Sequence, residues 1–193
     1  MKPETLQTQE DSRQSSDALV FDEIDVLQSV SRESFYHFVR EFWDAFIPEK
    51  FINNWHIQFL CGELQTIAER VFAGLPRLYD LVINVPPGST KSTLCSIMFP
   101  AWCWTRMPSA RFIGGSYSAP VALDLALRAR DLVQCDLYRA AFPEIRLRED
   151  QLAKTYYRNT RGGSRYSVGV GGSVTGIHGH FLLIDDPIDP KAA

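Results

Sequence analysis

The sequence predicts an α/β fold with a mainly parallel sheet flanked by helices. Two short apolar runs bounded by turn residues, at positions 78–85 and 181–184, are typical of buried strands. Segments with helical spacing of apolar residues alternate with such runs, which is the pattern of a parallel α/β sheet. The chain of 193 residues is 45% hydrophobic and 22% charged, so one domain can bury a core without disulfides or metals.

The N-terminal part is expected to be helical after a disordered arm. Residues 1–16 contain few large apolar side chains, which favours disorder. Residues 17–76 form a helical segment: apolar residues at three- and four-residue intervals predict one or two helices over 18–47 and another over 55–73. Gly74 and Pro76 end that last helix.

Residues 77–193 carry the alternating elements. The run 78–85 predicts the first strand, and a helix follows over 91–106, in which Pro100 produces a kink or a break. A second strand is expected over 110–117, and a helix over 120–135 has Pro120 in its first turn. Further expectations are a hairpin of 155–160 with 164–170 and a last strand over 181–184.

Charge, cysteine spacing and hydropathy argue against a strongly basic nucleic-acid-binding protein, a cysteine-ligated metal site and a membrane-spanning protein. The formal charge of −3 gives no overall electrostatic attraction for nucleic acid, so such binding needs a local basic patch. The cysteines lack metal-ligand spacing and are expected to be small buried apolar residues in a reducing compartment: Cys61, Cys95, Cys103 and Cys135. No apolar run approaches the roughly 20 residues of a membrane span, and a cytoplasmic protein without membrane contact is expected.

The segment NVPPGSTKST, residues 84–93, contains half of a possible nucleotide site. It lies between a predicted strand and a predicted helix, and Lys91-Ser92 matches the end of the pattern G-x-x-x-x-G-K-[ST]. Val85 and Thr90 occupy the two glycine positions, and Gly88 lies between them. The alternative is a turn before a helix, with Ser89 or Thr90 as the N-cap.

The segment HFLLIDD, residues 180–186, supplies the other half. Four apolar residues ending in two acids have the form of a strand whose first acid, Asp185, holds Mg²⁺, while Asp186 polarises the attacking water. Alternatively, the two acids only close a strand and begin a turn. Two such half-motifs in this order, about 90 residues apart, together predict a site for ATP and Mg²⁺ in a P-loop NTPase core.

Residues 50–190 resemble the N-terminal ATPase domain of the large subunit of tailed-bacteriophage terminases. The likeness rests on four stretches in the order of the family: 55–60 (WHIQFL), 84–93, 99–132 with its ARFIGGSYS segment, and 171–187, which ends in FLLIDDP. The resemblance implies a P-loop core of the ASCE type. It also implies that the loop 84–93 is a family variant of the glycine-bracketed pattern.

The resemblance assigns roles to individual residues. The loop residues Gly88, Ser89, Thr90, Lys91 and Ser92 would bind the triphosphate, with Ser92 and Asp185 on Mg²⁺. Asp186 would be the catalytic acid, where relatives often place glutamate. Arg128, with Arg130 as the alternative, would be the arginine that completes a neighbouring subunit's site. His56 and Gln58 would contact adenine, although an ordinary aromatic helix explains the same letters.

The implied function is the ATPase of a viral DNA-packaging motor in the host cytoplasm. Its partners would be double-stranded DNA, the terminase small subunit, the portal and further copies of the chain in a ring. Arg158, Arg161 and Arg165 would contact the DNA backbone or form a solvated hairpin. His178 and His180 are expected to be structural.

Two other functions stay open from the sequence. One is a helicase-like ATPase, although the letters after the last strand are Asp-Asp-Pro-Ile rather than Asp-Glu-x-His. The other is a non-catalytic interaction module. Since the sequence ends shortly after the acid pair, we expect a truncated chain without nuclease activity, in which ATP binding is a safer expectation than hydrolysis.

Overall fold

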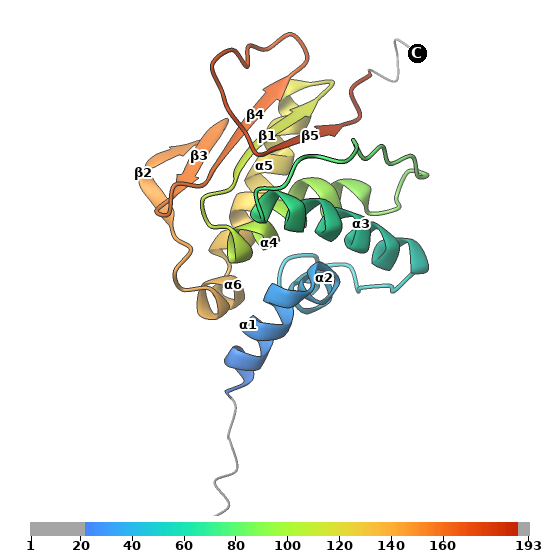
Figure 1. Ribbon diagram of the computed structural model, residues 1–193, viewed down its shortest axis with the longest axis vertical. Coiled ribbons are helices and arrows are strands. Elements are labelled where there is room, and N and C mark those ends of the chain that lie inside the picture. The colour runs from blue at the N-terminus through green and yellow to red at the C-terminus, as the bar shows by residue number, and fades with distance from the viewer. Residues whose placement is uncertain (1–21, 189–193) are drawn as a thin grey trace, which may run out of the picture.

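Helices and strands alternate along most of the chain in the computed structural model, which describes residues 22–188 (Figure 1). The expected arm over 1–16 therefore lies outside the described residues. In chain order the elements are α1 (Glu23–Glu33), α2 (Phe35–Trp43), α3 (Trp55–Phe72), the π-helix η1 (Thr93–Met98), α4 (Phe99–Arg106), β1 (Arg111–Ser116), α5 (Ala119–Gln134), α6 (Asp136–Ala141), β2 (Leu147–Ala153), β3 (Tyr156–Asn159), β4 (Ser164–Gly169) and β5 (Phe181–Asp185).

The sheet is mixed, so the prediction of a mainly parallel sheet is wrong. Its five strands lie in the order β2-β3-β4-β1-β5. β1 pairs in parallel with both β4 and β5, whereas β2, β3 and β4 pair antiparallel. The reason is local: short turns join β2, β3 and β4, and strands joined by a short turn can only pair antiparallel. The expected hairpin of 155–160 with 164–170 is confirmed as β3 and β4.

The apolar run 78–85 does not form the predicted strand. It is extended but pairs with no strand in the described residues, and Leu78 and Val82 are 64% and 87% exposed. Leu81 and Ile83 pack against the core, so alternate side chains point inward and outward as in a strand. An apolar run predicts extension, whereas pairing also needs backbone hydrogen bonds to a neighbouring strand, which the local residues do not determine. Among the described residues, β5 has no partner on its outer edge either.

Helices pack on one face of the sheet. α5 contacts β4 and β1, and η1 contacts β5. The covered face of β1 carries Phe112, Gly114 and Ser116, and the rings of Phe112 and Phe181 stack with their centroids 5.1 Å apart. On β5 the alternate residues Leu182 and Ile184 are 65% and 58% exposed. The side chains that face η1 and α5 therefore form the buried layer behind the candidate site.

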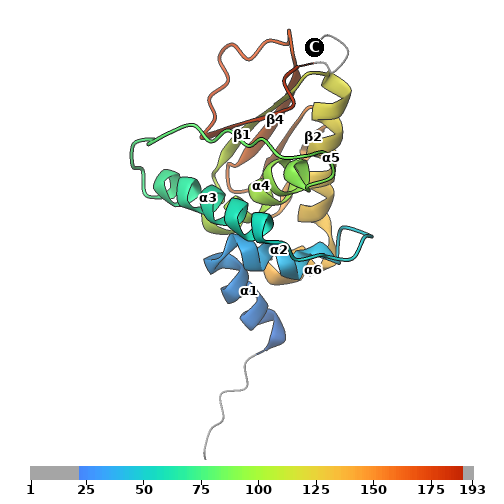
Figure 2. The same ribbon diagram turned by 90° about the vertical axis from the view of Figure 1, so that its right-hand side faces the viewer.

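The N-terminal helices lie at the end of the molecule away from the sheet (Figures 1 and 2). The expected segment over 18–47 is confirmed as two helices, which begin after the capping residues Asp22 and Ser34. Buried aromatic rings join α2 to α6. The rings of Phe38 and Phe42 on α2 stack with their centroids 4.5 Å apart, and both contact the ring of Tyr138 on α6. The helical segment is therefore packed into the same core as the sheet.

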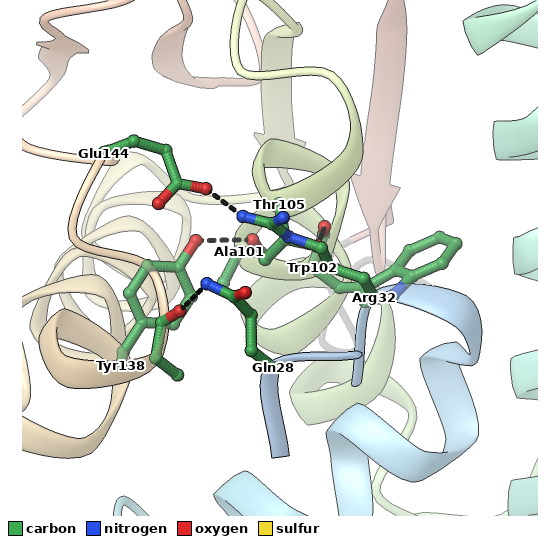
Figure 3. Close-up of polar contacts among 8 residues, drawn as sticks. Gln28, Arg32, Ala101, Trp102, Thr105, Tyr138 and Glu144 are labelled. Atoms are coloured by element: carbon green, nitrogen blue, oxygen red, sulfur yellow. Dashed lines mark hydrogen bonds and ion pairs between the residues drawn. The ribbon is translucent and has the colours of Figure 1, made fainter. Parts of the chain in front are cut away.

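Polar contacts fix α1 against α4 and α6 (Figure 3). Gln28 donates a 2.5 Å hydrogen bond to the carbonyl of Ala141, and Arg32 forms an ion pair with Glu144. The indole N–H of Trp102, which is fully buried, donates to the carbonyl of Ser31 at 2.9 Å. These contacts satisfy polar atoms beside the aromatic core, where an unpartnered group would cost about 1–3 kcal/mol.

Two elements were not predicted from the sequence. α6 has only six residues, and β2 is a mainly polar edge strand, so neither shows a clear period. The helix expected over 91–106 is present, and it passes through Pro100 after the π-helical segment η1. Among residues 22–188, no helix is both long enough and apolar enough to cross a membrane.

Candidate functional site

The loop before Lys91 contains a tight turn with two residues in the left-handed backbone region. Gly88 and Thr90 both have positive φ angles, +79° and +61°. Glycine tolerates this region, but a β-branched residue rarely adopts it and costs of order 1–3 kcal/mol there. Thr90 thus takes a backbone conformation that glycine usually provides, and the loop keeps its shape without glycine at that position.

The helix that follows begins directly after the loop. The carbonyl of Thr90 accepts a 2.9 Å hydrogen bond from the N–H of Leu94, while its hydroxyl donates to the carbonyl of Ser89 at 2.6 Å. The alternative interpretation, with Ser89 or Thr90 as a side-chain N-cap, has no support among the hydrogen bonds of this loop. The first N–H groups of a helix lack intrahelical partners. Here they lie beside the loop, where an anion is favoured.

The acid pair lies at the end of β5, as the sequence predicts. Asp185 is the last residue of the strand and is only 8% exposed, whereas the Asp186 side chain is 64% exposed. Asp186 has a φ angle of +43°, and its carbonyl accepts a 3.0 Å hydrogen bond from the N–H of Tyr117. That bond joins the ends of β5 and β1, so the two carboxylates are held in fixed positions.

Lys91 joins the two half-motifs. Its Nζ lies 3.3 Å from Oδ1 of Asp185 and forms a hydrogen-bonded ion pair with Asp186. Burial lowers the pKa of Lys91, but the hydrogen bonds and charges of Asp186 and Asp185 outweigh burial and raise the pKa above its usual value. Lys91 is therefore a cation between two carboxylates. The cluster of three side chains has a net negative charge when both acids are ionised.

An open hollow lies over this cluster. Residues 85–93 and Asp186 form it, and its volume is about 410 Å³, within the roughly 300–1,000 Å³ of small-molecule sites. The structure therefore brings together the predicted loop residues Gly88, Ser89, Thr90, Lys91 and Ser92 with Asp186, and Asp185 is in contact through Lys91.

The oxygen atoms at the site suit Mg²⁺. Ser92 lines the hollow, and Asp185 contacts Lys91, which also lines it. Within residues 22–188, no three His, Cys, Asp or Glu side chains gather around one point. Mg²⁺ is commonly held by one or two carboxylates together with phosphate oxygens and water. The hydroxyl and the buried carboxylate therefore fit a magnesium ion that accompanies a phosphate ligand.

The two predicted adenine residues lie on α3, and no hydrogen bond or ion pair joins them to the loop. Gln58 is exposed and lines a second open hollow with Trp55, Phe59, Gly62, Glu63 and Thr66. His56 is half-buried, and its Nε2 has no hydrogen-bond partner. The α3 hollow and the loop hollow share no lining residue. We assign the chemistry to the loop hollow, because the converging charges lie there.

The predicted arginines of α5 have local partners. The guanidinium of Arg128 lies over the ring of Phe46, 5.8 Å from its centroid. Arg130 lies 3.6 Å from Asp131 in a loose ion pair, and its Nε has no hydrogen-bond partner. Neither arginine contacts Lys91 or the acid pair within this chain. An arginine that acts on a neighbouring subunit would also lie away from its own site, so this placement leaves that role a prediction.

The hairpin arginines differ from one another. Arg161 is exposed in the turn between β3 and β4, but Arg165 is 1% exposed. The expectation that Arg165 contacts DNA or solvent is therefore wrong, because strand alternation turns this side chain toward the helices. His180 accepts a 3.0 Å hydrogen bond at Nδ1 from the N–H of Arg111, and burial lowers its pKa. That bond gives His180 a structural partner.

Two residues near the site were not singled out from the sequence. Ser116 pairs in register with Asp185, is 2% exposed and has an unpartnered hydroxyl. Because in-register residues of parallel strands point to the same face, Ser116 lies beside the buried carboxylate. Cys95 lies close enough to Asp185 for its charge to raise the thiol pKa, although burial is the larger cause of a pKa of about 12. Ser116 lies in the ARFIGGSYS segment, but nothing in that segment indicates a role for its hydroxyl, and Cys95 is expected from the sequence only to be a small buried residue.

Comparison with protein-family models finds no match for this chain, and comparisons with curated proteins and with solved structures find none either.

Proposed function

We propose that this protein binds ATP with Mg²⁺ at the loop 86–92 and is the ATPase part of a DNA-packaging motor. The observation that supports this most is the contact of Lys91 with Asp185 and Asp186, which are separated from it by more than ninety positions. The two segments match the two halves of a nucleotide site independently. If either segment matched its half-motif only by chance, the loop and the acid pair would have no reason to lie in contact.

The residues divide the chemistry between them. The ammonium of Lys91 binds phosphate oxygens, and the N–H groups at the start of the helix donate to the same anion. Ser92 and Asp185 would hold Mg²⁺, which would neutralise charge on the phosphates. Asp186, once released from Lys91, accepts a hydrogen bond from the water that attacks the terminal phosphate. Its exposed carboxylate lies at the rim of the hollow, where such a water can enter.

The link to DNA translocation rests on the resemblance of residues 50–190 to terminase ATPase domains. The fold is compatible with it, since β4, β1 and β5 are parallel and the acids at the end of β5 contact Lys91 of the loop. The unpaired run 78–85 differs from the expected first strand. Nucleotide binding is therefore the primary part of the proposal, and hydrolysis coupled to DNA is the secondary part.

A nucleotide titration tests the primary part. Mg·ATP should bind the wild-type chain, and Lys91→Ala should weaken binding by at least about tenfold, because hydrogen bonds to charged groups contribute roughly 1.5–3 kcal/mol. Lys154→Ala is the matched control, since Lys154 is an exposed lysine in the turn between β2 and β3. Equally poor binding by wild type and Lys91→Ala would favour a non-catalytic interaction module.

Phosphate release tests the secondary part. A packaging ATPase should release phosphate from ATP faster when double-stranded DNA is added. A single-stranded DNA of equal length serves as the control, because stimulation by single strands alone would favour the helicase-like alternative. Binding of Mg·ATP without any DNA effect would retain the nucleotide site and reject the motor.

A further inference from the structure

A buried arginine contacts the helix that follows the phosphate loop. The Nη1 of Arg165 on β4 donates a 2.5 Å hydrogen bond to the carbonyl of Ser96 in η1. In the part of the chain that the structure describes, no carboxylate lies within ion-pair distance of this guanidinium, and its Nε has no partner. A buried, uncompensated cation is costly, and arginine stays charged in proteins. The contact with Ser96 therefore needs a specific explanation.

In α-helical geometry, Pro100 would leave the carbonyl of Ser96 without a backbone donor. In an α-helix the N–H of residue 100 would donate to the carbonyl of residue 96, and proline has no N–H. The helix instead uses bonds between residues five apart over Thr93–Met98, as in the bond from Phe99 N–H to the Leu94 carbonyl. Arg165 supplies a donor from the neighbouring sheet to the carbonyl that Pro100 could not satisfy in the α register.

The surroundings leave room for this contact. Gly114 on β1 lies beside the guanidinium, and a Cβ at Gly114 would lie 3.4 Å from Nη2. Tyr157 lies close enough to Arg165 to interact with its charge, and the Tyr157 hydroxyl donates to the carbonyl of Ala126 on α5 at 3.1 Å. The guanidinium therefore lies between the sheet and the helices, and it joins β4 directly to η1.

The π-helical segment changes the direction of the residues before it. Each residue of an α-helix turns the chain by about 100°, and a π-helical turn contains one extra residue. An uninterrupted α-helix would therefore place Lys91 and Ser92 differently. Relative to the apolar face of α4, the π-helical segment rotates them by about 100°. In the observed register Lys91 faces Asp185 and Asp186.

We propose that Arg165 is a positioning residue for the phosphate loop. Its bond to Ser96 holds the π-helical register, and the register aims Lys91 and Ser92 at Asp185. The proposal deepens the proposed function, since it assumes that these residues bind a nucleotide phosphate. It also implies that a displacement of β4 changes nucleotide affinity, because β4 and the loop share this contact.

A set of four proteins tests the proposal: wild type, Arg165→Met, Pro100→Ala and the double variant. Mg·ATP affinity and the thermal midpoint are measured for each. Arg165→Met should lower the midpoint and weaken binding by roughly 10- to 100-fold, as the loss of outer-shell partners does elsewhere. Pro100→Ala alone should bind like wild type, because Arg165 still holds the register.

The double variant separates positioning from stability. The alanine that replaces Pro100 supplies an N–H to the carbonyl of Ser96, so the midpoint should return toward that of wild type. The helix then relaxes to the α register, and Mg·ATP binding stays weak. Arg40→Met is the matched control and should change neither quantity, because Arg40 is exposed on α2. Wild-type affinity in Arg165→Met or in the double variant would overturn the proposal, as would a double variant that fails to fold.

A structural measurement keeps this proposal distinct from the proposed function. If wild type binds Mg·ATP no better than Lys91→Ala, the nucleotide function fails. The hydrogen-bond register of η1 can still be determined by crystallography. In a crystal structure of the double variant, the N–H of Phe99 should donate to the carbonyl of Cys95, as in an α-helix. A retained bond to Leu94 would overturn the role of Arg165.

Discussion

Lys91 and Asp186 form an ion pair across 95 positions of sequence, at the mouth of the loop hollow. Asp186 is largely exposed. Its carboxylate pairs with the ammonium group of Lys91, which in the proposed function binds a phosphate oxygen. A carboxylate and a phosphate oxygen both accept charge-assisted hydrogen bonds from an ammonium group. Binding of a nucleotide therefore requires Lys91 to exchange Asp186 for the ligand, and this exchange makes the pair testable.

Removing the Asp186 charge should strengthen nucleotide binding while it abolishes turnover. Exposed ion pairs contribute up to about 1 kcal/mol, so Asp186→Asn should tighten Mg·ATP binding by up to about fivefold. Phosphate release should fall, because an amide cannot take the water's proton. Asp150→Asn removes another exposed, paired carboxylate and should leave affinity unchanged. Weaker binding of Mg·ATP by Asp186→Asn would contradict the exchange.

Glycine at position 90 should stabilise the protein. The left-handed backbone of Thr90 costs about 1–2 kcal/mol for a residue with a side chain, and glycine removes that cost but loses part of the gain through unfolded-state entropy. Thr90→Gly should therefore raise the free energy of unfolding by up to about 1 kcal/mol in urea denaturation. Thr66→Gly, in the exposed interior of α3, should lower it by a similar amount. A loss of stability in Thr90→Gly would show that the observed backbone is not strained.

The contact between Arg128 and Phe46 should contribute to stability and not to nucleotide binding by the isolated chain. Cation–π pairs at exposed sites contribute about 0.5–1 kcal/mol. A double-mutant cycle with Arg128→Met and Phe46→Leu should give a coupling energy in that range from chemical denaturation. Mg·ATP affinity should match wild type in all four proteins. Loss of affinity in Arg128→Met would place Arg128 at its own site.

Stability should fall when the pH rises above 9. Burial is the main cause that raises the pKa of Cys61 and of Cys95 to about 12 from an ordinary 9.0. Above pH 9 the unfolded chain therefore binds fewer protons than the folded chain, and unfolding is favoured, by up to about 1.4 kcal/mol per thiol and pH unit. Between pH 5 and 8 these thiols are protonated in both states and cause no change.

Urea denaturation at pH 8, 9 and 10 measures this effect, and a Cys61→Ala, Cys95→Ala double variant is the control. The variant should show a shallower decrease than wild type. Lys91 changes stability with pH in the same direction. Its pKa is raised in the folded state, so its contribution to stability is lost as the pH rises through that folded-state pKa. Identical slopes for wild type and variant would contradict a raised pKa for the two thiols.

Local signals predicted much of the fold and of the site. The helices over 23–43 and 55–72 follow from apolar spacing and caps, and β5 with its two acids follows from a short apolar run. The loop is recognisable because Lys91-Ser92 lies between an extended run and a helix. In each case a few neighbouring residues determine the conformation.

The features that sequence did not predict depend on distant partners. The run 78–85 has the residue pattern of a strand but pairs with no strand in the described residues, although the outer edge of β5 is unpaired there. The mixed sheet depends on how β2, β3 and β4 pair with one another. The burial of Arg165 depends on Gly114 and Ser96, although Pro100 four residues after Ser96 is a sequence signal for an unpartnered carbonyl. Local letters could not place Arg128 over Phe46 either.

The most direct test of the central claim is a backbone amide NMR titration of the wild-type protein with Mg·ATP. We predict chemical-shift changes centred on residues 86–93 and on Asp185 and Asp186, and the loss of these changes in Lys91→Ala. Shift changes confined to the α3 hollow around Trp55 and Phe59, or no changes at millimolar Mg·ATP, would contradict it.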